Sequence, residues 1–342
     1  MASPHAFEVP CVLERANSLD TLLDVFHVGR GDLAYLWLDH WVNLPETPSQ
    51  TSNNQDDART HGIALSETGN VIIFHQADPA VLIYNSTGEL LDRWGDRFPG
   101  AHGLTLVKEG KEEFLWLADS VTGEVVKTTL AGQEIQSIVP PDCVIYDVCA
   151  YKPTSVAVDE ERFGGSGDIW VADGYGASYL HRYDKKGNYL QSINGTEGPA
   201  GKFRCPHNIW IDNRKLEPEL YIADQENRRV QVYDLEGNFL RTFGEGILTS
   251  PSAFASYKDY LIIPELRGRV TILDSQDNFV CYLGENEAVC EIDGWPNLPS
   301  DLLMVGRFNS PHDVATDPDG NIYLVEWVIG GRVTKLVKKL IH

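Results

Sequence analysis

Short runs of alternating apolar and polar residues recur along this chain, separated by turns rich in Gly, Asn and Asp. One series consists of ELYIAD at 219–224, RVQVYD at 229–234 and FLRTFG at 239–244. Alternation with a period of two is typical of half-buried strands, and Gly, Asn and Asp pairs between such runs are typical of hairpin turns. Helical periodicity is scarce, so the pattern predicts an all-β fold.

The strand pattern repeats six times, in units of about 40–55 residues, the length that a β-propeller uses for one blade. We therefore expect six blades of four antiparallel strands. The last repeat ends after its third strand, near Leu340, and LAYLWLDHWV at 33–42 has the character of the missing strand. Closure by this N-terminal strand would remove an exposed sheet edge. The prediction is a single domain over 1–342, with an N-terminal segment at 1–57 and six repeats at 58–342.

Three equally spaced histidines, His102, His207 and His312, begin the similar phrases HGLTLV, HNIWID and HDVATD. They start the second, fourth and sixth repeats, where the innermost strand of each blade begins on one face of the ring. Alternate blades of a six-bladed ring are related by a pseudo-threefold axis, so the imidazoles are expected to converge there. Three histidines with an open fourth position are typical of catalytic zinc, although imidazole also suits copper, nickel and iron. The alternative is three hydrogen-bonding histidines that bind no metal.

Other side chains are predicted to share that face. His61 begins the first repeat and interrupts the alternation, so we expect it to face the substrate or to support the ligands. Glu265 and Glu326 end second strands, which return to the same face because neighbouring strands are antiparallel. Glu265 is expected to contact the substrate, and either glutamate is an alternative base or cation ligand. The competing interpretation is a solvated charge at the rim.

The formal net charge of −22 argues against nucleic acid and anionic membranes as partners, because both require a Lys/Arg footprint. No run approaches the roughly 18 apolar residues of a membrane helix. The first residues lack a basic segment followed by an apolar one, which favours a cytoplasmic location. We expect a small-molecule substrate, and the sequence does not fix the oligomeric state.

The repeats resemble NHL-repeat propellers, most clearly in ADQENRRVQVYDLEGNFLRTFG at 223–244, and the resemblance covers about residues 58–338. At the three histidine phrases the chain is similar to peptidyl-α-hydroxyglycine α-amidating lyases, which are six-bladed propellers with a zinc ion held by three histidines. The resemblance implies that Tyr175, in ADGYGAS, is the catalytic tyrosine. It assigns the zinc ligands to His102, His207 and His312.

The same resemblance implies a structural calcium ion in addition to zinc. It assigns to calcium the carboxylate of Asp313, which directly follows the third histidine. Backbone carbonyls near Ile63 and Leu104 would complete the site.

The chain departs from that family at positions that face the substrate. Gln76 and Gln225 stand where the family has two active-site arginines, and Gly176 replaces the cysteine that follows the tyrosine. Arginine offers a fixed charge and a bidentate fork, whereas glutamine is neutral. We therefore expect a zinc-dependent lyase with Tyr175 as general base. Its substrate, in contact with Gln76 and Gln225, should be small, hydroxylated, carbinolamide-like, and neutral or less anionic than the family's.

Two other functions stay open. A metal-dependent hydrolase of the lactonase or esterase kind would use the same ion to activate water. It would release an acid, where a lyase releases an aldehyde or a ketone. A non-catalytic NHL scaffold would bind another protein and hold no stoichiometric transition metal.

Overall fold

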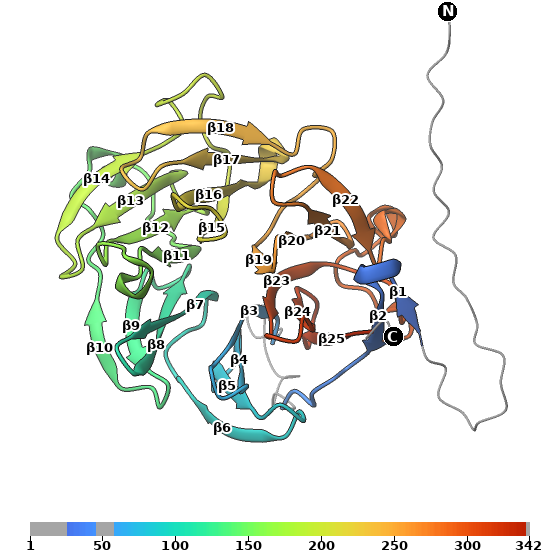
Figure 1. Ribbon diagram of the computed structural model, residues 1–342. Coiled ribbons are helices and arrows are strands. Elements are labelled where there is room, and N and C mark those ends of the chain that lie inside the picture. The colour runs from blue at the N-terminus through green and yellow to red at the C-terminus, as the bar shows by residue number, and fades with distance from the viewer. Residues whose placement is uncertain (1–25, 46–57, 340–342) are drawn as a thin grey trace, which may run out of the picture.

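Six β-sheets are arranged around a central axis like the blades of a propeller (Figure 1). The computed structural model describes residues 26–45 and 58–339 of the 342-residue chain. Paired strands within each sheet are antiparallel. The predicted all-β, six-bladed fold is confirmed.

Five blades are each formed by four consecutive strands. Blade 1 contains β3 (Thr60–Leu65), β4 (Val71–His75), β5 (Val81–Tyr84) and β6 (Leu90–Trp94). Blade 2 contains β7 (Ala101–Glu109), β8 (Glu112–Asp119), β9 (Val125–Thr129) and β10 (Glu134–Ser137). Blade 3 contains β11 (Ser155–Val158), β12 (Ile169–Asp173), β13 (Tyr179–Tyr183) and β14 (Tyr189–Ile193). Blade 4 contains β15 (Pro206–Asp212), β16 (Glu219–Asp224), β17 (Arg229–Tyr233) and β18 (Phe239–Phe243). Blade 5 contains β19 (Ala255–Tyr257), β20 (Tyr260–Glu265), β21 (Arg269–Leu273) and β22 (Phe279–Leu283).

Blade 6 joins the two ends of the chain. Its C-terminal strands are β23 (Pro311–Thr316), β24 (Ile322–Glu326) and β25 (Arg332–Lys338). The predicted closing strand is confirmed as β2 (Tyr35–Leu38), which pairs with β25 in antiparallel register. A fifth strand that was not predicted, β1 (His27–Val28), pairs with β2. Residues 1–25 and 46–57 of the N-terminal segment lie outside the described residues.

Short 3-10 helices occur only in connections between strands of the described part. They are η1 (Gly31–Leu33), η2 (Val144–Asp147), η3 (Glu161–Phe163), η4 (Gln225–Asn227), η5 (Glu287–Glu291) and η6 (Ser300–Leu302). None of the described helices has the length and apolar character needed to cross a membrane.

Hydrophobic cores form between neighbouring blades. In one, Trp116 of blade 2 packs in a buried cluster with Ile169 and Val171 of blade 3. In another, Tyr221 of blade 4 belongs to the same cluster as Ile263 of blade 5. The second strands are apolar on both faces because each sheet is covered on both sides, and this explains their nearly continuous apolar runs.

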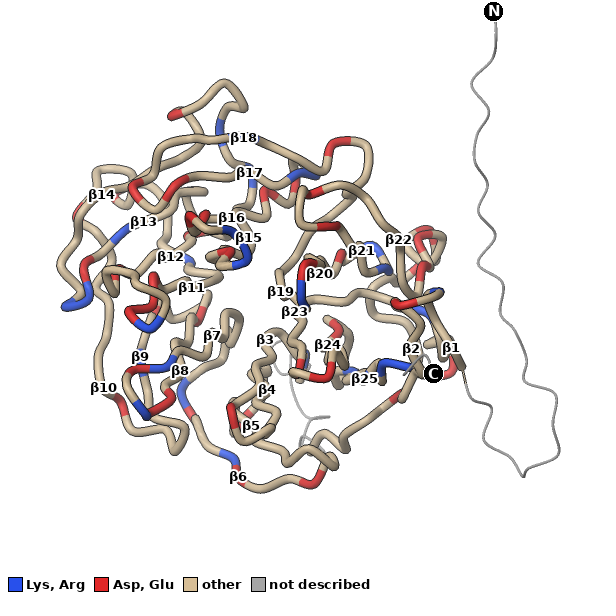
Figure 2. Tube along the Cα trace, viewed as in Figure 1, with Lys and Arg blue, Asp and Glu red and all other residues tan. Residues whose placement is uncertain are grey.

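The first strand of each blade lines the central channel, as predicted from the repeats. Channel-lining residues come from β3, β7, β11, β15, β19 and β23, and the channel encloses about 470 Å³. Lys and Arg are interspersed with Asp and Glu over all the blades (Figure 2). The acidic net charge is therefore spread around the ring.

A buried ion cluster ties blade 6 to the N-terminal segment. The Arg332 side chain is 0% exposed and lies 3.0 Å from the Glu326 carboxylate and 2.8 Å from that of Asp39. Replacement of Arg332 by Met would leave the buried Glu326 without its cation, which typically costs about 3–5 kcal/mol. We expect the free energy of unfolding, measured in urea, to fall by that amount. Asp39→Asn keeps the Arg332–Glu326 pair and should cost less; equal losses would contradict this account of closure.

Candidate metal centre

Irregular strand pairing marks the positions of four histidines. Where the first strands of blades 1, 2, 4 and 6 begin, their register with the second strands shifts. A β-bulge leaves a residue unpaired and redirects its side chain. The residues within these shifts include His61, His102, His207 and His312. In blade 3, by contrast, β11 pairs with β12 without a shift from Ser155 onward.

Each of the three predicted ligands is held by a backbone carbonyl of the next blade. The Nδ1–O distance is 2.8 Å in every case, from His102 to Thr154, from His207 to Ser252 and from His312 to His61. A carbonyl oxygen only accepts hydrogen bonds, so Nδ1 carries the proton and Nε2 carries the lone pair. The repetition on alternate blades matches the pseudo-threefold relation expected from the sequence spacing.

The three imidazoles form a nearly equilateral triangle. Ring centroids are 4.8 Å apart for His102 and His207, 4.7 Å for His207 and His312, and 4.9 Å for His102 and His312. Burial lowers the pKa of His207 to about 4 and holds the pKa values of His102 and His312 well below the ordinary value, with neighbouring imidazoles adding to the effect for the latter two. All three are therefore neutral near pH 7, which is the protonation state that binds metal.

The lone pairs inside the triangle outnumber the protons available to them. Nε2 of His102 and Nε2 of His207 lie 3.0 and 3.1 Å from the Tyr175 hydroxyl, which has one proton to donate. Nε2 of His312 is buried without a hydrogen-bond partner among the described residues. An unsatisfied buried acceptor typically costs about 1–3 kcal/mol. A divalent transition metal, which takes imidazole nitrogens at about 2.0–2.1 Å, fits this donor set.

A turn anchored by Asp173 brings Tyr175 to the imidazoles. The Tyr175 ring centroid is 4.8 Å from that of His102, and the residue as a whole is 43% exposed while its hydroxyl contacts the His102 ring. The Asp173 carboxylate accepts hydrogen bonds from the backbone N–H groups of Lys152 at 2.7 Å and Ala177 at 2.6 Å. Burial raises the pKa of Tyr175 well above its ordinary value. The phenolate therefore requires a nearby cation.

Gly176 leaves no room for a side chain in this turn. A Cβ atom there would lie 2.1 Å from Oδ1 of Asp173 and 2.5 Å from the carbonyl oxygen of Ala150. The cysteine that the family resemblance places at this position is therefore incompatible with the turn. We expect Gly176→Ala to lower the free energy of unfolding by about 1–3 kcal/mol and to displace Tyr175. Thermal unfolding measures the first effect, and unchanged stability would contradict the steric argument.

The two glutamines predicted to contact the substrate lie at the rim and are partly exposed. The backbone N–H of Gln76 donates to the carbonyl of Arg59 at 2.9 Å. The Gln225 side chain lies 3.4 Å from the carbonyl oxygen of Pro251 and 3.7 Å from the Cys205 thiol. Both amides remain candidates for substrate contact.

Glu265 does not fit the substrate contact expected from the sequence. Its side chain is 0% exposed, and its carboxylate accepts hydrogen bonds from the backbone N–H groups of Thr249 and Ser250. Glu326 is equally buried and accepts from the backbone N–H of Asn309 at 2.6 Å. These carboxylates fix the segments that lead into the inner strands. We therefore assign Glu265 a structural role, and neither glutamate is a solvated rim charge.

The residues implied for calcium line one channel. Asp313, Ile63 and Leu104 all contribute to the wall of the central channel. Oδ2 of Asp313 accepts from the backbone N–H of Ile63 at 3.0 Å, and Oδ1 accepts from that of Val314 at 2.8 Å. Burial raises the pKa of Asp313 to about 7.

Sequence reasoning missed several contributors to this site. The carbonyls of Thr154 and Ser252 that accept from His102 and His207 belong to the backbone, so the residue types do not reveal them and only the folded structure does. Arg59, two residues before His61, is 7% exposed, and its guanidinium lies 4.8 Å from the ring centroid of Trp327. That ring in turn lies 6.5 Å from the His61 ring. The sequence feature that could have indicated this contact is the basic residue Arg59 close to the start of the first repeat.

No protein-family model matches the chain. The chain is 26% identical over 329 residues to peptidyl-α-hydroxyglycine α-amidating lyase 1 of Drosophila melanogaster, an alignment that covers 80% of this chain and 56% of the relative. It is 24% identical over 327 residues to peptidyl-glycine α-amidating monooxygenase A of Xenopus laevis, covering 84% of this chain and 32% of the relative. It is 27% identical over 227 residues to NHL repeat-containing protein 3 of Mus musculus, covering 61% of this chain and 62% of the relative. The chain thus spans less than two thirds of the length of these relatives. The resemblance to amidating lyases and NHL-repeat proteins expected from the sequence is confirmed, at about 25% identity.

Solved structures support the fold. The virginiamycin B lyase of Staphylococcus aureus superimposes with a TM-score of 0.56 and 15% identity, covering 83% of this chain and 96% of that chain. A streptogramin B lyase superimposes with a TM-score of 0.54 and 13% identity, covering 83% of this chain and 80% of that chain. At 13–15% identity these structures show a similar fold and nothing about the function of this chain.

Proposed function

We propose that this protein is a zinc-dependent lyase of the amidating-lyase type that cleaves a small, carbinolamide-like substrate. Curated relatives with that activity in their names support the reaction class. The observation that carries the proposal is the set of three equivalent Nδ1–carbonyl hydrogen bonds. They orient three Nε2 lone pairs toward one buried space beside the Tyr175 hydroxyl.

Zinc held by His102, His207 and His312 would act as a Lewis acid and lower the pKa of a substrate hydroxyl beside it. The Tyr175 oxygen lies 3.0 and 3.1 Å from two ligand nitrogens, so beside the bound cation Tyr175 would enter the reaction as the phenolate and accept that proton. As the C–O bond becomes a carbonyl, the C–N bond breaks and its electron pair stays on nitrogen. Tyr175 returns the proton to that nitrogen. The products are an amide and an aldehyde, and no other reactant is required.

The rim favours a substrate with little negative charge. Gln76 and Gln225 offer amide groups in place of the two arginines that the resemblance implies, so they can bind a neutral group by hydrogen bonds. The Arg59 guanidinium is almost fully buried over the Trp327 ring. We therefore propose that a neutral carbinolamide is a better substrate than one with a free carboxylate.

Product analysis tests the proposed reaction. The full chain, loaded with zinc, is incubated with an N-acyl-α-hydroxyglycine and with the corresponding neutral α-hydroxyglycinamide. We expect equimolar amide and aldehyde from both, higher kcat/KM for the neutral compound, and loss of turnover with a chelator. An acid product from a lactone or ester, with no cleavage of either carbinolamide, would identify a hydrolase instead. No turnover and no bound metal would favour the scaffold.

A structural calcium ion is part of the same proposal. The support is that Asp313, Ile63 and Leu104 line one channel close to the histidines, with the Asp313 carboxylate buried there. Carboxylate and carbonyl oxygens are the ligands that calcium prefers.

A further inference from the structure

A fourth imidazole shares the environment of the three predicted ligands. His61 lies at a register shift of the same kind, between Thr60 and Gly62, and is 3% exposed. Its ring centroid is 4.6 Å from that of His312 and 5.1 Å from that of His102. These distances match those within the ligand triangle, so His61 belongs to the same group of rings.

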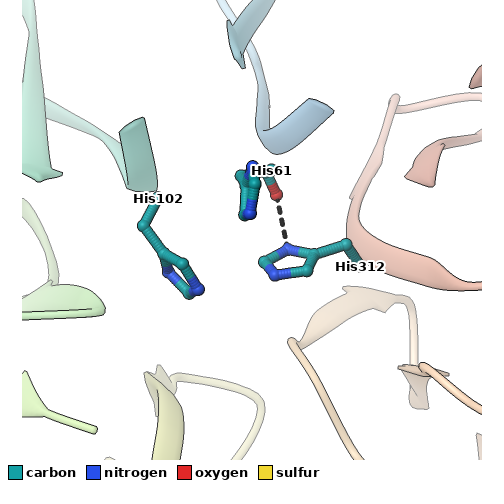
Figure 3. A group of neighbouring side chains, drawn as sticks. All are labelled: His61, His102 and His312. Atoms are coloured by element: carbon teal, nitrogen blue, oxygen red, sulfur yellow. Dashed lines mark hydrogen bonds between the residues drawn. The ribbon is translucent and has the colours of Figure 1, made fainter. Parts of the chain in front are cut away.

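The His61 ring presents its lone pair to the group. Its Nδ1 donates to the Arg59 carbonyl at 3.3 Å, so the proton is on Nδ1 and the lone pair is on Nε2. The ring nitrogens that could bind metal on His61, His102 and His312 all lie within 4.8 Å of one another. Figure 3 shows these three rings directed toward a common space. The backbone carbonyl of His61 meanwhile supports His312, so one residue serves both purposes.

We propose that His61 is a direct ligand of the ion, in a four-imidazole site completed by His102, His207 and His312. This proposal rests on the proposed function, because it concerns the same ion. Opposite nitrogens around an octahedral or square-pyramidal ion lie about 4.2 Å apart, twice the usual metal–nitrogen distance. Shifts of a few tenths of an ångström per ring close the 4.8 Å spread among the nitrogens of His61, His102 and His312. His207 is not part of that group of nitrogens, and its place in the site rests on its ring centroid, 4.8 Å from that of His102 and 4.7 Å from that of His312.

A four-imidazole site differs in chemistry from a three-imidazole one. The ligands are neutral in both sites, so the ion keeps its full charge in either, and the difference lies in the number of positions that the protein fills. The substrate then takes a fifth position, and the site suits ions that accept five or six ligands. This assigns His61 a role different from both roles expected from the sequence, which were to face the substrate or to support the ligands.

Metal-binding measurements test the assignment without relying on turnover. The full chain is compared with His61→Gln, His207→Gln and the matched control His75→Gln. His75 ends β4 in the same blade as His61, is equally buried, and its Nε2 contacts the Pro79 carbonyl at 2.7 Å. Zinc affinity is measured by competition with a chromophoric chelator, and the ligand nitrogens of bound copper(II) are counted by electron paramagnetic resonance.

We expect four coupled nitrogens in the wild type and three in His61→Gln, with zinc affinity lowered at least about 10–100-fold. The His75→Gln variant should match the wild type. If His61→Gln does not fold, His61→Ser replaces it, because serine is the residue at the corresponding strand start of blade 3.

Two results would overturn the proposal, and they differ in what they leave of the proposed function. Unchanged affinity and nitrogen count in the His61 variant, with loss of metal in His207→Gln, would leave a three-histidine site and the proposed function intact. Absence of metal binding by the wild-type chain would remove the proposed function as well.

Discussion

The variant His207→Ala is expected to hold no ion and to lose at least about 100-fold in turnover, while the propeller remains folded. The substitution removes one corner of the imidazole triangle, and even loss of supporting residues around metals typically costs 10–100-fold. The free energy of unfolding should fall by only about 2 kcal/mol, since the side chain makes two hydrogen bonds, to the Ser252 carbonyl and with the Tyr175 hydroxyl, each worth about 1 kcal/mol. Metal content by mass spectrometry and kcat/KM measure the two losses.

Asn208→Ala is the matched control for this variant. Asn208 lies in the same register shift and lines the central channel, but it supplies no imidazole. It should retain metal and activity. Normal turnover in a metal-free His207→Ala protein would show that the reaction does not depend on an ion held by these histidines.

Tyr175→Phe should keep its metal and lose about 10²–10⁴-fold in kcat, the range typical for removal of a general acid–base group. The phenyl ring can occupy the same exposed turn, so the fold and the imidazole positions are retained. What disappears is the hydroxyl that lies 3.0 Å from Nε2 of His102 and 3.1 Å from Nε2 of His207. Single-turnover kinetics on the zinc-loaded protein separates this loss from any change in substrate binding.

Tyr179→Phe provides the comparison, because Tyr179 begins β13 four residues later and its ring stacks on His181. It should turn over at a near-normal rate. If Tyr175→Phe were equally active, the proton would have to move through another group, and the Tyr175 role in the mechanism would be wrong.

The sequence predicted the architecture because strand alternation and repeat length are determined locally. The closing strand was identifiable since Trp37 and its neighbours alternate between buried and half-buried positions, as a strand at the core requires. The equal spacing of His102, His207 and His312 placed them on alternate blades, and the structure brings their rings within 4.9 Å of one another. Periodic features of this kind can be read from the sequence because each repeat folds into one blade.

Features that depend on contacts between distant residues were not predictable. The sequence placed Glu265 at the correct end of β20. Its hydrogen bonds from the backbone N–H groups of Thr249 and Ser250, however, depend on the path of the preceding loop. The approach of the His61 ring to those of His102 and His312 was likewise not predictable, because it depends on the bulge at the start of β3. The need for Gly176 follows only from the position of the Asp173 carboxylate.

The central claim is that imidazoles from alternate blades share one ion above the channel. Anomalous diffraction at the zinc absorption edge, from crystals of the full chain grown with zinc, tests it most directly. The account predicts one strong peak about 2.0–2.1 Å from the Nε2 atoms of His102, His207 and His312. A peak elsewhere on the protein, or none among these rings, would contradict it.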